Sequence, residues 1–209
     1  MIPHPSLDIS GSLGSELAGK KIVLALSGSV AVVQSVELAR LLIRHGAEVF
    51  PVMSQQATRL IGPELLEWAT GQRPIVELTG KIEHVALVGN VPRPADLLLI
   101  APATANTIGK MAAGIDDTPV TTFFTTAFGE GIPVLVVPAM HLSMYRHPFV
   151  KENISKLEKW GVSVVMPRFS EGKAKIDDSE TILASVISRL SKRKDFEGKT
   201  VLVTAGRTV

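Results

Sequence analysis

Small and polar residues that could form a ligand site follow two apolar runs near the start of the chain. Ser27, Gly28, Ser29 and Val30 separate the first apolar run from a helical pattern. Backbone N–H groups at such a helix start can hold a phosphate, assisted by the helix dipole. With only one glycine, the turn does not match the G-x-G-x-x-G dinucleotide fingerprint and favours a mononucleotide. Ser54 ends the second apolar run, where its hydroxyl either completes a phosphate site or caps a helix.

A second stretch follows the apolar run Leu97–Ile100 and contains only small residues: Pro102, Ala103, Thr104, Ala105 and Asn106. At the carboxyl end of a strand, such a turn lets backbone N–H groups and short side chains approach a flat or phosphorylated ligand. The alternative is a simple strand-to-helix loop in which Thr104 caps the helix.

Two histidines are candidates for proton transfer. His84 lies in a segment without a regular pattern before the central strand, which could place it over a ligand, but a lone histidine is also commonly structural or exposed. Met140, His141 and Met144 come just after another buried run. The methionines either fill the core or converge with residues 101–106 to form a pocket.

Alternating strands and helices must position these residues. Apolar runs predict strands over 21–26, 47–53, 97–100, 133–137 and 162–166, with an extended piece over 74–78. Apolar residues at helical spacing predict helices over 30–44, 64–70, 108–113, 117–128, 149–160 and 179–192. Strands that are apolar on both faces are typical of parallel sheets covered by helices on both sides. We therefore predict an α/β protein with a three-layer, doubly wound, Rossmann-like parallel sheet.

Composition excludes several classes of function. The chain of 209 residues has no cysteine, which removes disulfides, thiolate metal sites and cysteine nucleophiles, and we assign no metal site. A net charge of +2 without long charge runs argues against nucleic-acid and membrane-surface partners. No apolar run approaches the roughly 20 residues of a membrane span, and no signal pattern opens the chain. We expect a cytoplasmic protein.

The domain organisation is expected to have four parts. Residues 1–18 read as an arm, 19–190 as the main domain and 191–197 as a linker. The last segment, 198–209, begins GKTVLVTAGRT and echoes GKKIVLALSGS at 19–29. We expect this segment to be the truncated start of a second domain; the alternative is an isolated edge strand.

Taken together, the motifs resemble the flavin-containing cysteine decarboxylases, in particular the phosphopantothenoylcysteine decarboxylase domains of bifunctional coenzyme A biosynthesis proteins. The resemblance rests on SGSVA at 27–31, His84, APATANTIGKMAAGIDDT at 101–118 and PAMHLSMY at 138–145. Residues 198–209 similarly resemble the opening of the ligase domain that follows in those proteins. The resemblance implies a flavoprotein fold with FMN bound at a subunit interface, in a homotrimer or homododecamer.

The implied activity is the FMN-dependent decarboxylation of 4'-phosphopantothenoylcysteine to 4'-phosphopantetheine. FMN would oxidise the cysteinyl side chain to a thioaldehyde before CO2 is lost, because the resulting carbanion is then delocalised toward sulfur. Reduced FMN would then return the two electrons to give 4'-phosphopantetheine. The implied catalytic residues are His84, as the base, and His141. FMN would be held by Gly28, Ser29, Val30, Ser54, Ala103, Thr104 and Asn106. The substrate would contact Met140, His141 and Met144.

The chain departs from the family pattern at three points. His141 stands where the family has an asparagine that holds the substrate carboxylate, and Tyr145 stands where tryptophan is common. An imidazole can also donate a hydrogen bond, so we expect carboxylate binding to persist. The family's flap cysteine, a proton donor, is absent, and the corresponding segment 168–178 offers Lys173 and Lys175. These lysines either donate the proton and bind the substrate phosphate or belong to a solvated loop.

Two other functions remain open on the sequence. A flavin prenyltransferase would share the fold and the FMN site, although we find no counterpart of its arginine- and tyrosine-rich phosphate site. A non-catalytic or regulatory flavoprotein subunit is favoured by the missing cysteine and disfavoured by His84. A domain that binds NAD or a nucleotide sugar is disfavoured because Met53 and Ser54, not an acidic residue, end the second strand.

Overall fold

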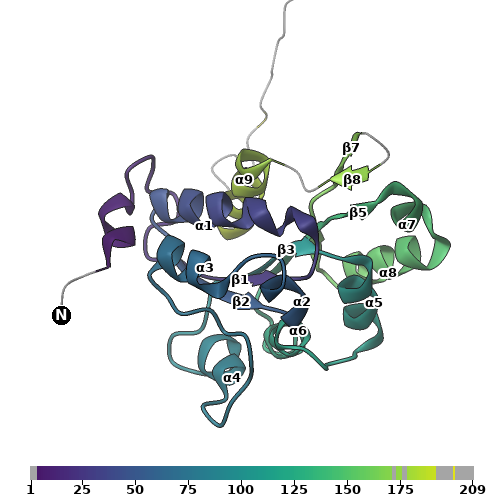
Figure 1. Cartoon of the computed structure of the whole chain (residues 1–209), viewed down its shortest axis with the longest axis horizontal. Helices are drawn as coiled ribbons and strands as arrows, with labels where there is room; N and C mark the ends of the chain where they lie inside the picture. The colour runs from purple at the N-terminus through teal and green to yellow at the C-terminus, as the bar shows by residue number, and fades with distance from the viewer. Residues whose placement is uncertain (1–3, 171–172, 176–177, 192–199, 201–209) are drawn as a thin grey trace, which may run out of the picture.

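A five-stranded parallel sheet forms the centre of the molecule (Figure 1). The computed structural model describes residues 4–170, 173–175, 178–191 and 200. The strand order is β2-β1-β3-β4-β6. The strands are β1 (Lys21–Leu26), β2 (Glu48–Met53), β3 (Leu97–Ala103), β4 (Val134–Pro138) and β6 (Ser163–Val164). Because the chain proceeds to opposite sides of β1, the switch point where such sheets bind ligands lies between β1 and β3.

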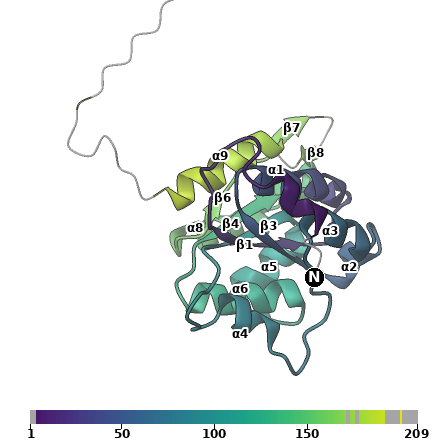
Figure 2. The ribbon, with the colours of Figure 1, turned by 90° about the vertical axis from the view of Figure 1, so that its left-hand side faces the viewer.

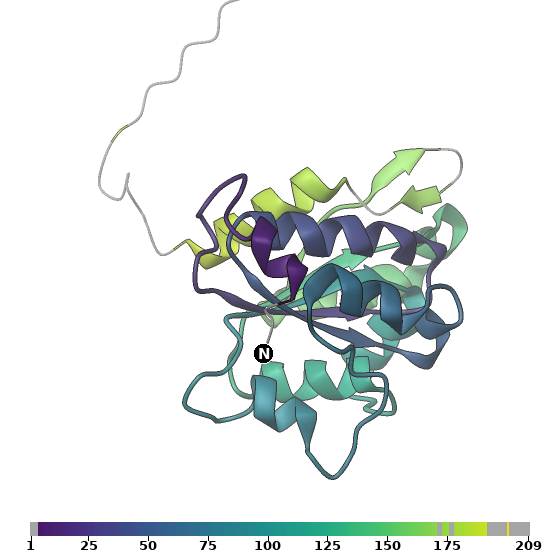
Figure 3. The same ribbon diagram turned by 60° about the vertical axis from the view of Figure 1, so that its left-hand side comes forward.

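Helices cover both faces of this sheet (Figures 2 and 3). One layer contains α1 (Ser35–Arg44), α2 (Gln55–Thr58), α3 (Pro63–Thr70) and α9 (Ser179–Leu190). The other contains α4 (Glu83–Val88), α5 (Ala105–Ala113), α6 (Pro119–Gly129) and α8 (Pro148–Lys159). The short helix α7 (Leu142–Arg146) precedes α8 and contacts it. The predicted three-layer, doubly wound α/β fold is therefore confirmed.

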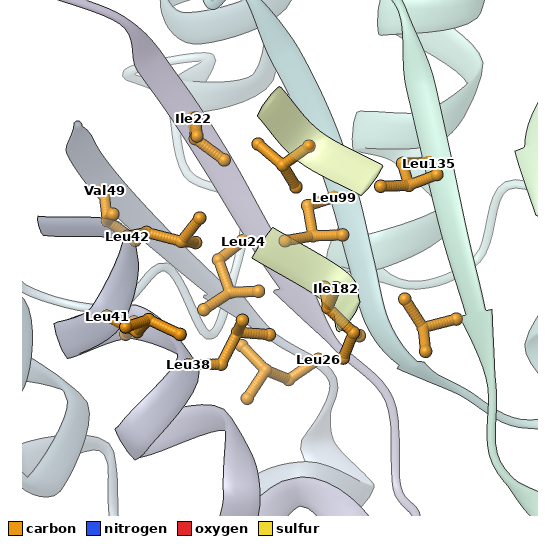
Figure 4. Close-up of a cluster of buried hydrophobic side chains, with 14 of the residues drawn as sticks. Ile22, Leu24, Leu26, Leu38, Leu41, Leu42, Val49, Leu99, Leu135 and Ile182 are labelled. Atoms are coloured by element: carbon orange, nitrogen blue, oxygen red, sulfur yellow. The ribbon is translucent and has the colours of Figure 1, made fainter. Parts of the chain in front are cut away.

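The strands β1, β2, β3 and β4 each contribute to two hydrophobic cores. On β1, Leu24 and its alternating neighbours pack under α1 and α9, as Figure 4 shows, whereas Val23 and Ala25 face the opposite layer. Leu98 and Leu99 of β3 divide in the same way. Burial on both faces explains why these strands are continuous apolar runs in the sequence.

Several local predictions need correction. The segment around His84, predicted to be irregular, forms the helix α4. The predicted helix over 30–44 is divided into a 3-10 helix, η2 (Val30–Gln34), and α1. The strand predicted over 162–166 is limited to β6, and of the extended piece over 74–78 only Ile75 forms a bridge, with Val52. These differences arise where elements are short and periodicity is weak.

A second, antiparallel sheet replaces part of the loop considered for 168–178. It has the order β5-β8-β7, with β5 (Met140–His141), β8 (Lys173–Lys175) and β7 (Arg168–Ser170) (Figure 1). Its strands are too short to show alternation in the sequence, so pairing across the chain decides their structure.

The beginning of the chain packs against the main domain. A 3-10 helix, η1 (Pro5–Ile9), is followed by a segment whose Leu17 side chain is fully buried. Backbone N–H groups of Gly11 and Leu17 donate to the carbonyls of Ile43 and His45 at the end of α1. Apart from Ser191 and Thr200, the predicted linker at 191–197 and the predicted domain start at 198–209 lie outside the described residues.

Candidate active site

A cavity of about 880 Å³ lies beyond the carboxyl ends of β1, β2 and β3. Its wall brings together several predicted site residues: Gly28, Ser54, Thr104, Asn106 and Met144. It also contains residues that the sequence analysis did not select, among them Gln56, Glu77, Lys110 and Thr122. The volume is within the range of about 300–1,000 Å³ typical of small-molecule and cofactor pockets.

Gly28 allows the turn after β1 to approach α2 closely. A Cβ atom added at Gly28 would lie 2.3 Å from Cβ of Gln56, and 3.2 Å from its carbonyl carbon. Real Cβ atoms do not approach so closely, so a side chain at position 28 would push the two walls of the cavity apart. The glycine predicted as a phosphate-binding residue is thus required for the shape of the cavity.

Three helix starts face the cavity. Ser54, Thr104 and Thr118 each precede a helix, and each side-chain oxygen accepts a hydrogen bond of 3.2 Å from the backbone N–H three residues later. The prediction that Thr104 caps a helix is confirmed, and Ser54 also caps one. Because a hydroxyl that accepts a capping bond keeps its own O–H donor, Ser54 can still bind an anionic ligand. The Thr104 hydroxyl also shares a 3.1 Å hydrogen bond with the hydroxyl of Thr107, in which either oxygen can donate, so one O–H of this pair is left for a ligand.

Ser27 joins the two ligand-facing turns. Its buried hydroxyl donates to the carbonyl of Pro102 at 2.8 Å and accepts from the N–H of Thr104 at 2.9 Å. These bonds hold the turn after β1 against the turn after β3. The sequence analysis named Ser27 only as a turn residue, because its partners are 75 and 77 positions away.

An ion pair closes the loop between α5 and α6. Lys110 Nζ lies 2.9 and 2.7 Å from the two carboxylate oxygens of Asp117. Thr122 Oγ1 donates to the carboxylate of Asp116 in the same loop. These charged residues lie inside the long motif at 101–118, but nothing in their local pattern indicated a pairing.

His84 lies on α4, outside the cavity lining of the single chain. Its ring packs edge-on to Phe123 of α6, with 6.5 Å between ring centroids. Nδ1 of His84 is buried and has no hydrogen-bond partner among the described residues. A buried polar atom without a partner is costly, which marks His84 as a functional candidate.

The start of α4 is unusually constrained. Ile82, immediately before the helix, has φ 46°, a left-handed conformation that is rare for a β-branched residue. The hydroxyl and N–H of Thr79 both donate to the Glu83 carboxylate. The Thr79 hydroxyl is the main cause that lowers the pKa of Glu83 to about 2, and the Thr79 N–H adds to it. The helix that carries His84 is therefore held at its first turn.

The other predicted residues lie around the cavity or behind it. Met144 lines the cavity, while His141, three residues earlier, is exposed at the start of α7 and forms no side-chain cap. Met140 is half-buried. Tyr145 is buried, its hydroxyl lies 3.7 Å from Sδ of Met166, and burial raises its pKa.

Three predicted cofactor residues do not line the cavity of the single chain. Ala103 is fully buried in the second core. Ser29 caps η2 through a 3.4 Å bond from the Ala31 N–H, and Val30 is 76% exposed. Lys173 and Lys175, predicted to contact substrate, lie on β8.

The residues that line the cavity fit a flavin mononucleotide. Gly28 lets the turn after β1 lie close to the start of α2, and the three capped helix starts border the same cavity, where they offer N–H groups to a phosphate. The described residues contain no group of three or more His, Asp or Glu side chains that could hold a metal ion. Across the same residues, no helix is long and apolar enough to cross a membrane.

Comparison with known proteins identifies relatives over the whole domain. Residues 10–191 match the family model described as Flavoprotein. The chain is 56% identical over 208 residues to the coenzyme A biosynthesis bifunctional protein CoaBC of Thermococcus kodakarensis, covering 100% of this chain and 51% of that protein. The chain thus spans about half the length of the curated relatives that it matches.

Solved structures of similar proteins share this fold over most of the chain. The FMN-dependent cysteine decarboxylase SpaF has a TM-score of 0.72 and 28% identity, over 83% of this chain and 98% of that chain. A mutant PPC decarboxylase complexed with pantothenoylaminoethenethiol has a TM-score of 0.64 and 26% identity, over 80% of this chain and 96% of that chain.

Proposed function

This chain belongs to the Flavoprotein family, and from that premise we propose that it binds FMN and decarboxylates 4'-phosphopantothenoylcysteine to 4'-phosphopantetheine. The observation that carries the proposal is the cavity at the switch point of the sheet, bordered by the capped starts of α2, α5 and α6. The CoaBC relatives and the solved PPC decarboxylase support this choice of reaction over others on the same fold.

The cofactor would be held by the turns after β1, β2 and β3. Gly28 would offer its backbone N–H to the FMN phosphate, and Ser29 and Ser54 their hydroxyls, because the Ser29 N–H already donates to the carbonyl of Ser27 at 2.8 Å. Val30 would lie along the ribityl chain. Thr104 and Asn106 would border the flavin ring, with Ala103 supporting it from the core. Bound FMN supplies the reversible two-electron oxidation that lets the carbon next to sulfur support loss of CO2.

His84 would act as the base. Its buried Nδ1 has no partner in the described part of the chain that would compete for a proton. Packing against Phe123 and the constrained start of α4 fix the position of the ring. Because His84, Ser29 and Val30 do not line the cavity of one chain, we propose that a neighbouring subunit completes the site, in a homotrimer or homododecamer.

His141 and the residues near it would bind substrate. His141 takes the place of the family asparagine at the start of α7, and Met140 and Met144 are its neighbours at the cavity rim. Its imidazole can donate a hydrogen bond to a carboxylate. The reaction consumes and produces water-soluble metabolites, and we place the protein in the cytoplasm.

One feature favours a second candidate, a non-catalytic flavoprotein subunit. The chain contains no cysteine, so the proton donor that the family carries on its flap is absent. A non-catalytic subunit would bind flavin without releasing CO2, whereas an enzyme that lacks only this donor would release CO2 and accumulate the enethiol.

A visible absorption spectrum and a product assay test the proposal. Purified protein is expected to show flavin bands, to release CO2 from 4'-phosphopantothenoylcysteine and to yield 4'-phosphopantetheine by mass spectrometry. Flavin bands without CO2 release would favour the non-catalytic subunit. A colourless protein that does not take up added FMN would refute the flavoprotein proposal.

A further inference from the structure

A second hollow of the surface lies where three helices of one layer end. It has a volume of about 330 Å³ and is bordered by the ends of α5, α6 and α8. Its lining includes Met111–Gly114, Phe128 and Trp160, and no residue that lines it also lines the cavity at the carboxyl ends of the strands. We call it the apolar groove, and it is a surface separate from the candidate active site.

The wall of the apolar groove is aromatic. Phe124 is buried and stacks on Phe128 with 5.6 Å between ring centroids, and Phe128 lies 6.4 Å from the ring of Trp160. Phe128 and Trp160 are both exposed, and so is Ile115, which directly follows Gly114 of the lining. Large apolar side chains that gather on a surface mark an interaction site. Because neighbouring rings already hold these side chains, they lose little conformational freedom when a partner covers them.

The two edges of the apolar groove carry opposite charges. Glu130 directly follows Gly129 on the edge formed by α6. Lys156 lies on the edge formed by α8, with its Nζ 4.8 Å from the centroid of the Trp160 ring. Among the residues that the structure describes, neither Glu130 nor Lys156 forms an ion pair. The surface is therefore complementary to a copy of itself turned by half a turn about an axis along the groove.

The apolar groove and His84 lie on different sides of α6. His84 of α4 packs on Phe123, whereas Phe128 lines the groove. Five positions on a helix correspond to directions about 140° apart around its axis. A neighbouring subunit that completes the flavin site from the side of α4 therefore leaves the groove open to another contact.

We propose that the apolar groove is a two-fold contact between two copies of this chain. Phe128 and Trp160 of one copy pack against the same rings of the other, and Glu130 faces the partner's Lys156. This inference rests on the proposed function for the trimer, and it goes further because it assigns the surface that joins one trimer to the next. A closed assembly of trimers, such as the homododecamer, needs a two-fold contact in which both chains present the same surface.

The expected size of this contact explains why it would act between trimers. A fully buried aromatic side chain covers about 150–250 Å², and Phe128 and Trp160 are only partly exposed before contact. A pair of chains would thus bury less than the roughly 1,200–2,000 Å² of a typical stable complex. Each trimer carries several copies of the groove, so simultaneous contacts between trimers strengthen one another.

The first test replaces one aromatic side chain and measures the mass of the flavin-loaded protein by sedimentation velocity. Trp160→Glu places a charge in the contact and is expected to lower the mass about fourfold, from dodecamer to trimer, with the flavin content unchanged. Trp68→Glu is the matched control. Trp68 is 54% exposed and Trp160 50%, and the Arg40 guanidinium lies over the Trp68 ring as Lys156 lies over Trp160. This control should keep the mass of the wild type.

The second test exchanges the charges at the two edges. Glu130→Lys and Lys156→Glu each place like charges opposite each other across the two-fold contact, and each should raise the protein concentration needed for assembly about tenfold. The double variant should restore assembly, because each edge again meets the opposite charge. Thermal unfolding of all variants shows whether the fold is kept.

Three results with these variants would overturn the contact: an unchanged mass for Trp160→Glu, equal losses of mass for Trp160→Glu and Trp68→Glu, or a double charge variant that assembles no better than the single ones. A wild type that sediments as a flavin-containing trimer would overturn it as well and leave the proposed function standing. Wild-type protein that takes up no flavin would instead refute the proposed function, while the masses of the variants would still decide the contact.

Discussion

The helix starts around the cavity and the two candidate histidines are held in different ways. Ser54 and Thr104 each form a hydrogen bond to the helix that they begin, and Gly28 approaches α2 as closely as backbone allows. Nδ1 of His84, by contrast, is buried without a partner in the described chain, and His141 forms no cap on α7. Residues that shape the cavity are thus satisfied by local contacts, whereas the histidines lack them. The comparison indicates that the histidines are placed for something that the single chain does not contain.

Replacing His84 by leucine should have the largest effect on activity, because it should lower the decarboxylation rate without lowering the stability of the fold. Loss of a general base is expected to lower the decarboxylation rate by about 10²–10⁴-fold. The free energy of unfolding should stay the same or rise by about 1 kcal/mol, because an unpaired buried nitrogen is removed. Turnover assays and thermal unfolding measure the two effects. His147→Leu, at an exposed histidine, is the control, and wild-type turnover in His84→Leu would contradict a catalytic role.

A side chain at Gly28 should damage the cavity and the fold together. Because the new Cβ atom would meet Gln56 at 2.3 Å, Gly28→Ala is expected to cost about 1–3 kcal/mol of unfolding free energy and to lower bound flavin at least tenfold. Flavin absorbance per protein and thermal unfolding are the measurements. The matched control is Gly109→Ala within α5, where the added Cβ atom would be 3.6 Å from Asn153. That variant should be neutral or slightly stabilised.

Removal of two helix caps separates cofactor binding from stability. Thr104→Val at the cavity and Asp178→Ala at the start of α9 each remove a side chain that accepts from a backbone N–H. Thr104→Val should lower the free energy of unfolding by about 1 kcal/mol, and Asp178→Ala should lower it as well. Only Thr104→Val is expected to weaken FMN binding, measured by titration of the flavin-free protein. Equal FMN affinity in both variants would mean that Thr104 acts solely as a cap.

The smallest expected effect lies at the amino ends of β1 and β3, at the end of these strands opposite to the cavity. Burial by itself would raise the pKa of Asp96, but the Lys20 ammonium and the Lys21 N–H, each at 2.9 Å, outweigh burial and lower the pKa. A carboxyl whose pKa is lowered by folding stabilises the protein above its unfolded-state pKa, about 3.9. This stabilisation is lost as the pH falls further, through the folded-state value.

Asp96→Asn should therefore be less stable than wild type at neutral pH, by about 0.5–1 kcal/mol for a partly exposed pair. Below about pH 4 the difference should shrink, because the wild-type carboxyl becomes protonated. Thermal unfolding between pH 7 and pH 2.5 measures this, with flavin content expected to be unchanged at pH 7. An equal pH dependence in both proteins would show that the Asp96 carboxylate contributes no stability.

Much of the scaffold could be predicted because its signals are local. The apolar runs of β1, β3 and β4 indicated strands buried on both faces, and Thr104 indicated a helix start. The helix carrying His84 was missed because it is shorter than two turns and follows Ile82, whose positive φ no pattern would predict. The site roles of the histidines and lysines stay predictions until the experiments above are done.

The sequence by itself determined the layered α/β architecture, the ligand-facing turns and the choice of cap residues, because each depends on neighbours within a few positions. Only the tertiary structure decided which distant residues meet. It brings Gly28 against Gln56 and lets Ser27 join two turns. It also packs His84 on Phe123 and pairs the backbone of Lys173 with that of His141. These contacts join segments distant in the chain. Their geometry follows from strand order and register, which the spacing of residues along one segment does not specify.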